Sequence, residues 1–348
     1  MKKYLLIILA GGFLLSCSSN QQDDNKNEEK QTVDSAAVQK QALLEKAQGI
    51  FKVLPDSAPN PNNKLTPEKV DLGKKLYFDN ILSLNQTQSC NTCHNLDTYG
   101  VDNLPVSKGD KGENGTRNSP TVLNAALHIA QFWDGREPDV EAQAGGPVLN
   151  PVEMAMPDEK TVETRLAESD VYPDMFKKAF PENENPITYE NMKKAIGAFE
   201  RTLLTPSKFD DFLKGNVDAL NDDELKGLDL FINKSCITCH NGALLGGGMY
   251  QKFGIFGNYW DYTKSERIDE GKYEVTKNEA DKYVFKVPSL RNIEKTYPYF
   301  HDGSVEGLNE AVKIMAKAES NIDLNDEEVK YIVTFLKTLT GTVPESAK

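Results

Sequence analysis

Apolar residues recur at helical spacing in several segments of the chain, and the clearest of these segments covers residues 66–79, TPEKVDLGKKLYFD. Its apolar positions are Val70, Leu72, Leu76 and Tyr77. Thr66 is a suitable N-cap, because its hydroxyl can accept a hydrogen bond from a free amide of the first turn. Pro67 follows at the first helical position, where a missing N–H costs nothing. The pattern therefore predicts a helix that begins directly after Thr66.

Three further segments have the same character. Residues 221–234 begin with Asn221 and Glu224 at the spacing of a capping box. Residues 188–203 carry an apolar stripe made of Met192, Ile196, Phe199 and Leu203. Residues 325–339 carry another, made of Val329, Ile332, Val333, Leu336 and Leu339. Long glycine- and proline-rich stretches with little strand pattern separate the segments, so the chain is predicted to be mainly α-helical.

The first residues have the pattern of an export signal. Lys2 and Lys3 precede an apolar run over residues 4–15, and Cys17 follows Ser16. The run is too short to span a bilayer comfortably, which disfavours a membrane anchor. The Leu-Leu-Ser-Cys sequence resembles the lipobox of bacterial lipoproteins, with an ordinary signal peptide as the alternative. The resemblance implies that residues 1–16 are removed and that a lipid on Cys17 anchors the exported protein on the periplasmic side or elsewhere in the cell envelope.

Residues 17–45 continue as a polar, charged segment without aromatic residues. Such a composition buries too little apolar surface to fold alone, so we expect a flexible tether behind the lipid. The whole chain has a net charge of −13, which becomes −15 without residues 1–16 because these carry two lysines and no acid. This charge argues against a nucleic-acid partner.

Four of the five cysteines lie in two nearly identical segments, SCNTCHN at residues 89–95 and SCITCHN at residues 235–241. A disulfide framework would suit an exported protein but does not require the histidine after each pair. A zinc site could use both pairs, but the adjacent histidines would be poorly placed as ligands. A c-type haem uses all three residues, since two thiols bond to the porphyrin and the imidazole ligates iron. We therefore predict two covalently bound haems c, one on Cys90, Cys93 and His94 and the other on Cys236, Cys239 and His240.

Each haem motif is preceded by one predicted helix and followed, after long loops, by another. The chain is therefore predicted to form two duplicated, mainly α cytochrome c-type domains, each wrapping one haem. Their expected bounds are residues 46–205 and 206–348.

The loops carry a specific resemblance. The segments CNTCHNLDTYGVDNLP, RNSPTVLNAALHIAQFWDGR, QAGGPVLNPVEM and FKVPSLRNIEKTYPYFHDGSVEGLNEAVKIM resemble those of the bacterial di-haem cytochrome c peroxidases, from about residue 66 to the C-terminus. The resemblance implies that hydrogen peroxide is the substrate. It also implies a small electron-donor protein, a monohaem cytochrome c or a cupredoxin, and a homodimer. The first motif would carry the peroxidatic haem and the second the electron-transfer haem.

Met315 lies fourteen residues after His301 of FHDG, at the spacing of the methionine that ligates the C-terminal haem in this family. His/Met ligation raises a haem's reduction potential, as suits an electron-accepting centre. Met249 in GGGMY is the rival ligand, although its glycine-rich setting favours a loop.

The resemblance assigns the acid–base role to Glu153 of PVEM, with Gln143 nearby. A carboxylate over an open iron position can take a proton from one peroxide oxygen and give it to the other. Between them, Gly145-Gly146-Pro147 is predicted to form a turn that lets the backbone pass close to the porphyrin.

The resemblance also places Trp133 between the two haems, where it would help to couple them. It further implies a calcium ion bound by the side chain of Asn118 and by the backbone carbonyls of Thr296 and Pro298. Oxygen ligands suit calcium, although backbone ligands leave no trace in a sequence.

The remaining histidines are interpreted as non-ligands: His301 as a neighbour of the C-terminal haem, and His128, on a helical-looking stretch, as a packed or surface residue. Many family members have a histidine sixteen residues after the first haem's histidine, and it caps the resting iron. Asp110 stands at that spacing here, and carboxylate is a poor haem ligand by comparison. We therefore expect the first haem to be open to peroxide even when oxidised, unless His128 caps it instead.

Two other functions compete with the peroxidase. One is a di-haem oxidase that acts on a partner protein during cofactor maturation, but that relative has a tyrosine where this chain has Met315. The other is a non-catalytic electron-transfer lipoprotein, which would have both irons capped.

Overall fold

The fold is taken from a computed structural model that describes Met1 and residues 37–347. The predicted signal peptide, the lipidation of Cys17 and most of the predicted tether lie outside these residues. The chain divides into two compact units, residues 1–42 and residues 43–348. The described part of the first unit, apart from Met1, is helical over residues 37–42. No helix among the described residues is long and apolar enough to cross a membrane.

The predicted tether is wrong at its C-terminal end. Residues 37–50 are helical, and Leu44 and Ala47 are buried. The segment AVQKQALLEKAQGI is rich in alanine, leucine, glutamine and lysine, which favour helix, and its apolar side chains have a core to pack against.

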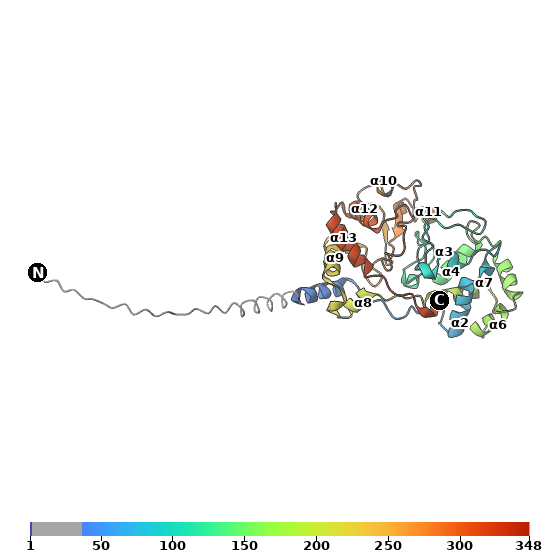
Figure 1. The fold of residues 1–348 in the computed structure, drawn as a ribbon. Helices are drawn as coiled ribbons and strands as arrows, with labels where there is room; N and C mark the ends of the chain where they lie inside the picture. The colour runs from blue at the N-terminus through green and yellow to red at the C-terminus, as the bar shows by residue number, and fades with distance from the viewer. Residues whose placement is uncertain (2–36, 348) are drawn as a thin grey trace. The chain divides into compact units, whose positions relative to one another are not determined.

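The first half of the second unit is a group of helices around one core (Figure 1). They are α2 (Pro67–Phe78), α4 (Val140–Leu149), α5 (Glu159–Ala167), α6 (Tyr172–Ala179) and α7 (Tyr189–Glu200). The longest pair, α2 and α7, pack closely at Gly73, where an added Cβ would lie 1.9 Å from the carbonyl oxygen of Ala195. The core between these helices includes Leu72, Leu76, Met192 and Ile196.

The second half repeats this plan. Its helices are α8 (Lys208–Leu213), α9 (Asp222–Asn233), α12 (Leu308–Ser320) and α13 (Asp326–Lys337). Helices α9 and α13 pack closely at Gly227, where an added Cβ would lie 2.0 Å from the carbonyl oxygen of Tyr331. The two halves therefore share a helix pair that crosses at a glycine. This repeat and the helical content confirm the predicted mainly α, duplicated fold.

Short elements complete the described part of the chain. A two-stranded antiparallel sheet pairs β1 (Tyr250–Lys252) with β2 (Val284–Lys286), with Tyr250 opposite Lys286. The others are α3 (Cys90–Cys93), α10 (Tyr259–Thr263), α11 (Tyr273–Thr276), η1 (Asn80–Leu82), η2 (Leu96–Thr98), η3 (Ala125–Leu127), η4 (Val217–Ala219), η5 (Cys236–Thr238), η6 (Glu279–Asp281) and η7 (Glu345–Ala347).

All four helices predicted from periodicity are present, as α2, α7, α9 and α13. The Thr66 side chain accepts a hydrogen bond from the Lys69 amide at the start of α2. Asn221 and Glu224 form the predicted capping box at the start of α9. The stretch around His128 is helical only as the single turn η3, and His128 itself is extended.

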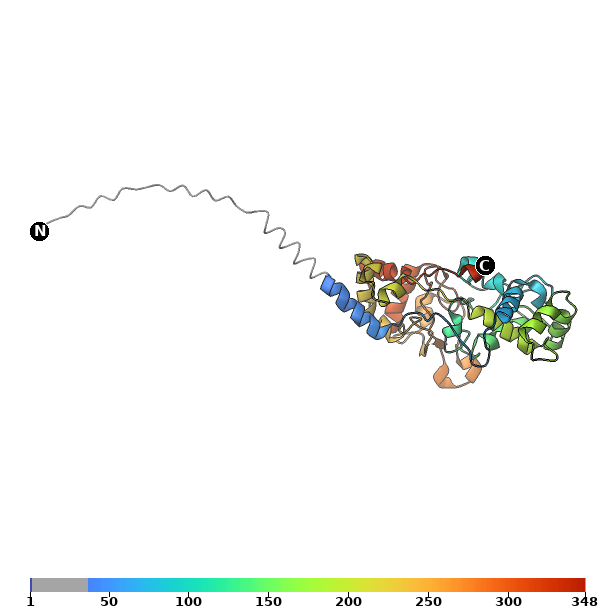
Figure 2. The same cartoon turned by 90° about the horizontal axis from the view of Figure 1, so that it is seen from below.

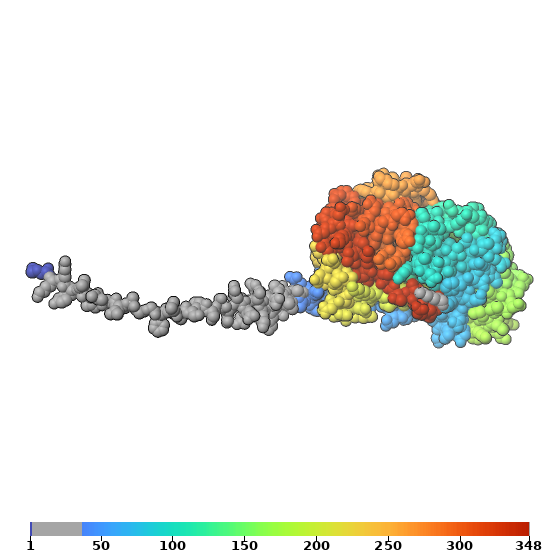
Figure 3. Space-filling model, in the orientation of Figure 1, coloured from blue at the N-terminus to red at the C-terminus, as the bar shows by residue number. Residues whose placement is uncertain are grey.

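The two halves exchange terminal segments, so the predicted linear division at residue 205 does not follow the packing. Leu44, Ala47 and Phe51 belong to the core of the second half. Val343 and Ala347, at the other end of the chain, pack with Tyr77 and other core residues of the first half. Figures 2 and 3 show this C-terminal segment, in red, against the blue residues of the first half.

Candidate functional site

The first haem motif is held by local hydrogen bonds. Ser89 and Thr92 form a capping box at the start of α3. The amide of His94 donates to the carbonyl oxygen of Cys90 at 2.9 Å, and the hydroxyl of Tyr77 donates to the carbonyl oxygen of His94. Burial lowers the pKa of His94, which favours the neutral imidazole that binds metals. Its Nδ1 is buried without a hydrogen-bond partner among the described residues.

A cavity of about 300 Å³ opens beside this motif. Its lining contains all three motif residues, Cys90, Cys93 and His94. The same lining contains Gln143, Glu153 and Trp133, together with Phe132 and Arg136. The structure therefore brings the predicted haem attachment, the predicted acid–base pair and the predicted coupling tryptophan to one cavity.

Gln143 is carried by α4, which Asp139 caps by accepting a hydrogen bond from the Ala142 amide at 2.8 Å. The predicted turn at Gly145-Gly146-Pro147 is wrong, because these residues lie inside α4. Gly145 serves helix packing instead. An added Cβ there would lie 2.7 Å from the Lys193 side chain of α7, so its absence lets the two helices approach.

Glu153 follows α4 in a tight turn. The Asn150 side-chain amide donates to Oε1 of Glu153 at 2.9 Å, which leaves Oε2 as the oxygen without this bond. Burial raises the pKa of Glu153, although the charge of Arg136 and the Asn150 hydrogen bond oppose the change. Glu153 also acts electrostatically on Cys93, which places this carboxyl group near the haem attachment. A half-buried carboxyl group with a raised pKa is suited to acid–base chemistry.

Asp110 lies on a hairpin loop that forms part of the cavity wall through Lys108 and Gly109. Its carboxylate accepts hydrogen bonds from the Asn85 amide at 2.8 Å and from Thr87. Asp110 is not among the described residues that line the cavity. The side chain therefore stabilises a neighbouring turn.

The second haem motif has a well-defined ligand histidine. The amide of His240 donates to the carbonyl oxygen of Cys236 at 3.0 Å. Its Nδ1 lies 2.9 Å from the carbonyl oxygen of Leu245, and an N–H at Nδ1 would leave the Nε2 lone pair available to a metal. Burial lowers the pKa of His240 and so favours the neutral imidazole. None of the four motif cysteines forms a disulfide, and no group of three or more His, Cys, Asp or Glu side chains among the described residues could hold a metal ion.

Met315 is a half-buried residue of α12. Val312, one turn earlier, packs against the core that also contacts Cys236. Glu319, one turn later, acts electrostatically on Cys239. Because residues three and four apart share a helix face, Met315 lies on the face of α12 that is directed to the second motif. The rival Met249 precedes β1, and its carbonyl oxygen accepts a hydrogen bond from the Val287 amide at 2.9 Å.

Trp133 connects the two halves. Its indole N–H donates to the carbonyl oxygen of Asn118 at 2.9 Å, and its ring centroid lies 6.3 Å from that of His301. Its own carbonyl oxygen accepts a hydrogen bond from the Lys286 amide at 2.8 Å.

Asn118, one of the predicted calcium ligands, contacts the segment that carries the other two. The Asn118 amide donates to the carbonyl oxygen of His301 at 2.7 Å, which places Asn118 beside the segment that contains Thr296 and Pro298. The Asn118 side-chain nitrogen donates to the carbonyl oxygen of Leu104 at 2.9 Å.

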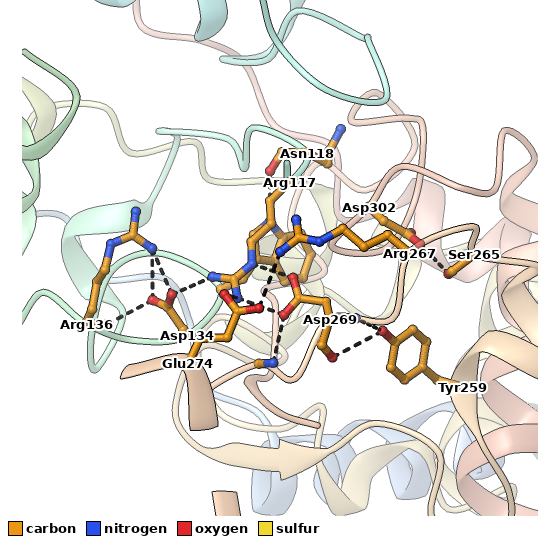
Figure 4. A network of polar contacts seen from close by, with 12 residues as sticks. Arg117, Asn118, Asp134, Arg136, Tyr259, Ser265, Arg267, Asp269, Glu274 and Asp302 are labelled. Atoms are coloured by element: carbon orange, nitrogen blue, oxygen red, sulfur yellow. Dashed lines mark hydrogen bonds and ion pairs between the residues drawn. The ribbon is translucent and has the colours of Figure 1, made fainter. Parts of the chain in front are cut away.

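The sequence analysis missed an ion-pair network in the wall of the cavity (Figure 4). Arg117 bonds to Asp134 of the first half and, at 2.7 Å, to Asp269 of the second. Asp134 also pairs with Arg136, whose guanidinium lies 3.4 Å from the centroid of the Phe132 ring. Charged residues so far apart in sequence carry no spacing signal, so periodicity and motif arguments could not find this network. It ties the cavity wall to the second half.

Comparisons with known proteins agree with this site. A family model described as Di-haem cytochrome c peroxidase matches residues 67–218, and one described as Cytochrome c matches residues 225–340. Cytochrome c551 peroxidase of Nitrosomonas europaea is 48% identical over 289 residues, which cover 82% of this chain and 84% of that protein. Cytochrome c551 peroxidase of Pseudomonas aeruginosa is 44% identical over 308 residues, which cover 88% of each chain.

The fold also has a solved counterpart. The crystal structure of a MauG-like protein associated with microbial copper homeostasis has a TM-score of 0.75 and 28% sequence identity, covering 85% of this chain and 95% of that one. Together with the identity and coverage of the two cytochrome c551 peroxidases, this structural similarity shows that the chain belongs to the di-haem cytochrome c peroxidase family.

Proposed function

We propose that the protein reduces hydrogen peroxide to water with electrons from a small redox protein, as the names of the two cytochrome c551 peroxidases to which it is similar suggest. The observation that carries the proposal is the shared cavity in which Glu153 and Gln143 face the first haem motif. An electron-transfer protein has no need of a raised-pKa carboxyl group at an accessible haem cavity.

The haem c groups of this family fit the residues present. Cys90 and Cys93 line a cavity beside the half-buried His94, whose lowered pKa favours the neutral imidazole, and Tyr77 holds that histidine's backbone. We propose that these residues hold the peroxidatic haem. Cys236, Cys239, His240 and Met315 would hold the electron-transfer haem. When bound, the haems supply a binding position for peroxide and relay the two electrons that the reduction takes from the donor protein.

The protein's own contribution to the chemistry is proton transfer. Reduction of one peroxide to two waters consumes two electrons and two protons. Oε1 of Glu153 is held by Asn150, so Oε2 takes the proton from one peroxide oxygen and delivers it to the other, which leaves as water when the O–O bond breaks. The two electrons and two protons then reduce the remaining oxygen to the second water. Gln143 lines the same cavity, where its amide can hold the peroxide in position.

Trp133 suits the proposed coupling role because it contacts both halves of the second unit. Its indole is bonded to Asn118 beside the first cavity, while its ring faces His301 and its carbonyl oxygen meets Lys286 in the second half. Calcium between Asn118, Thr296 and Pro298 would hold this junction. A homodimer and a lipid anchor on Cys17, with the protein on the periplasmic side or in the cell envelope, complete the proposal.

The test is peroxide-dependent oxidation of a reduced small cytochrome c by the purified holoprotein. We expect Glu153→Gln to lower the turnover rate by about 10²- to 10⁴-fold, the usual range for loss of general acid–base catalysis. Glu159→Gln is the matched control, since Glu159 is exposed at the start of α5. Wild-type turnover equal to that of Glu153→Gln would contradict the acid–base role. Absence of any turnover would favour the electron-transfer lipoprotein, and oxidation of a partner protein alone would favour the maturation oxidase.

A further inference from the structure

A chain of contacting rings leads away from the first cavity into the second half. It begins at Trp133, which lines that cavity and whose ring centroid lies 6.3 Å from that of His301. The ring of His301 lies 5.0 Å from that of Tyr259, which in turn lies 5.0 Å from that of Trp260. These pairs meet edge to face, at interplanar angles of 72°, 81° and 82°. Neighbouring rings are therefore in contact from the cavity wall to Trp260.

Hydrogen bonds tie the middle of this chain to the cavity wall as well. The hydroxyl of Tyr259 accepts a hydrogen bond from the Asp269 amide at 2.6 Å and donates to the Asp269 carbonyl oxygen at 3.2 Å. The Asp269 carboxylate pairs with Arg117, which lines the first cavity (Figure 4). Tyr259 is completely buried, so these contacts hold its ring between His301 and Trp260.

The chain contains the two kinds of side-chain ring that lose an electron most easily, indole and phenol. Trp133 and Trp260 are the two tryptophans of the protein, and Tyr259 lies between them in the chain. Electron transfer slows steeply with distance, so a series of short steps between contacting rings is faster than one long step. The chain can therefore pass electrons from Trp260 towards the cavity.

The end of the chain differs from its middle in access to water. The Tyr259 hydroxyl donates to a backbone carbonyl oxygen, which is a poor proton acceptor, so an oxidised Tyr259 readily takes its electron back from a neighbour. Trp260 is half-buried, so water can accept its proton and supply an oxygen atom. Oxidation that reaches Trp260 can therefore be completed there.

We propose that Tyr259 and Trp260 carry oxidising equivalents away from the first cavity when no electron donor is bound, and that Trp260 is the side chain then oxidised. The inference rests on the proposed peroxidase function and goes beyond it by assigning a sacrificial oxidation site. The route spares the oxidisable side chains that line the cavity itself, Met154 and Trp133.

The electrons and atoms balance. Trp260 loses two electrons and, together with one water molecule, two protons, and a C–O bond forms on its indole ring. The two electrons and two protons reduce one hydrogen peroxide to two waters when its O–O bond breaks. The net reaction consumes one peroxide, adds one oxygen atom to Trp260 and releases one water.

The experiment exposes the oxidised holoprotein, without donor and without dioxygen, to a small excess of hydrogen peroxide labelled with a heavy oxygen isotope. Digestion and mass spectrometry then locate the oxygen gained by both tryptophans and by Met154. We expect Trp260 to gain unlabelled oxygen from water, because it loses electrons through the chain and does not contact peroxide. Labelled oxygen on Trp260, or an unmodified Trp260, would overturn the proposal.

Tyr259→Phe tests the route, because it keeps a ring at this position but removes the easily oxidised phenol. Oxidation of Trp260 should fall severalfold, and oxidation of Met154 and Trp133 should rise. Tyr172→Phe is the matched control, since Tyr172 is equally buried and also bonds through its hydroxyl, but lies in the core of the first half. Equal oxidation of Trp260 in the two variants would contradict the route.

Trp260→Phe provides an arm that leaves the hydrogen bonds of Tyr259 intact. After incubation with peroxide alone, this variant should lose its turnover with reduced cytochrome c at fewer equivalents of peroxide than the wild type does, and an equal loss would contradict the protective role. Turnover with a donor but no oxidation of Trp260 would reject the route and leave the proposed function standing. Absence of turnover with a donor would reject both.

Discussion

The buried pair of Asp210 and Arg291 makes a quantitative prediction about the second haem loop. Their side chains are 1% and 0% exposed and are joined by two hydrogen bonds, of 2.7 and 2.8 Å. Arg291 also donates through Nε to the carbonyl oxygen of Ala243, three residues after His240. Asp210 accepts from the amide of Leu54 at 2.7 Å. The pair therefore joins the exchanged N-terminal segment, the start of the second half and the loop of the second haem motif.

Asp210→Asn keeps the shape of the side chain but leaves the Arg291 charge buried and uncompensated. Breaking a buried pair in this way costs about 3–5 kcal/mol of the free energy of unfolding. Asp326→Asn is the matched control, since its pair with Lys313 is exposed and such pairs contribute little. Urea titrations followed by circular dichroism measure both variants. Equal stability of Asp210→Asn and Asp326→Asn would refute the reasoning.

The same pair predicts the sign of a pH dependence. Burial alone would raise the pKa of Asp210, but the hydrogen bonds and charge of Arg291 outweigh burial and lower it. The unfolded chain therefore takes up a proton at higher pH than the folded protein. The stabilisation is present above the unfolded-state pKa and is lost as the pH falls through the folded-state value. Asp210→Asn should remove this part of the acid sensitivity, so its stability relative to wild type should improve as the pH falls.

Three further predictions concern packing, the resting state and the anchor. Gly73→Ala should cost about 1–3 kcal/mol by overpacking the contact of α2 with α7, whereas Gly49→Ala, where an added Cβ meets nothing within 4 Å, should not lower the melting temperature. The oxidised holoprotein should show one high-spin haem by electron paramagnetic resonance, since Asp110 caps a turn rather than an iron; two low-spin six-coordinate haems would contradict this. Cys17→Ser should abolish incorporation of labelled palmitate during expression, and unchanged labelling would exclude the predicted lipid site.

The sequence predicted the helical frame well because local signals determine it. At α2 and α9, the caps Thr66 and Asn221 and a one-sided apolar stripe lie within a single helix. The haem motifs could also be identified from the sequence, because each is a short continuous segment. The site around them was predicted through the family resemblance. In the structure, this site corresponds to the cavity that Glu153 and His94 both line.

The errors and omissions have long-range causes. Gly145 was expected in a turn, but it lies in a helix, where the Lys193 side chain of another helix occupies the space that a Cβ would need. No local pattern reveals this contact. The pairing of Arg117 with Asp269 joins positions 152 residues apart. The contact of His128 with Lys286 is similarly distant, at 158 residues. Such partners are chosen by the tertiary fold, so the sequence could identify the reactive groups but not what surrounds them.

The central claim, that this chain is a working peroxidase, is tested most directly by stoichiometry. Purified holoprotein, a reduced monohaem cytochrome c and a limiting amount of hydrogen peroxide are mixed, and the oxidised cytochrome is counted by absorbance. The account predicts two cytochromes oxidised for each peroxide consumed, because reduction to two waters takes two electrons. Peroxide loss with oxygen release and without cytochrome oxidation, or no loss at all, would contradict it.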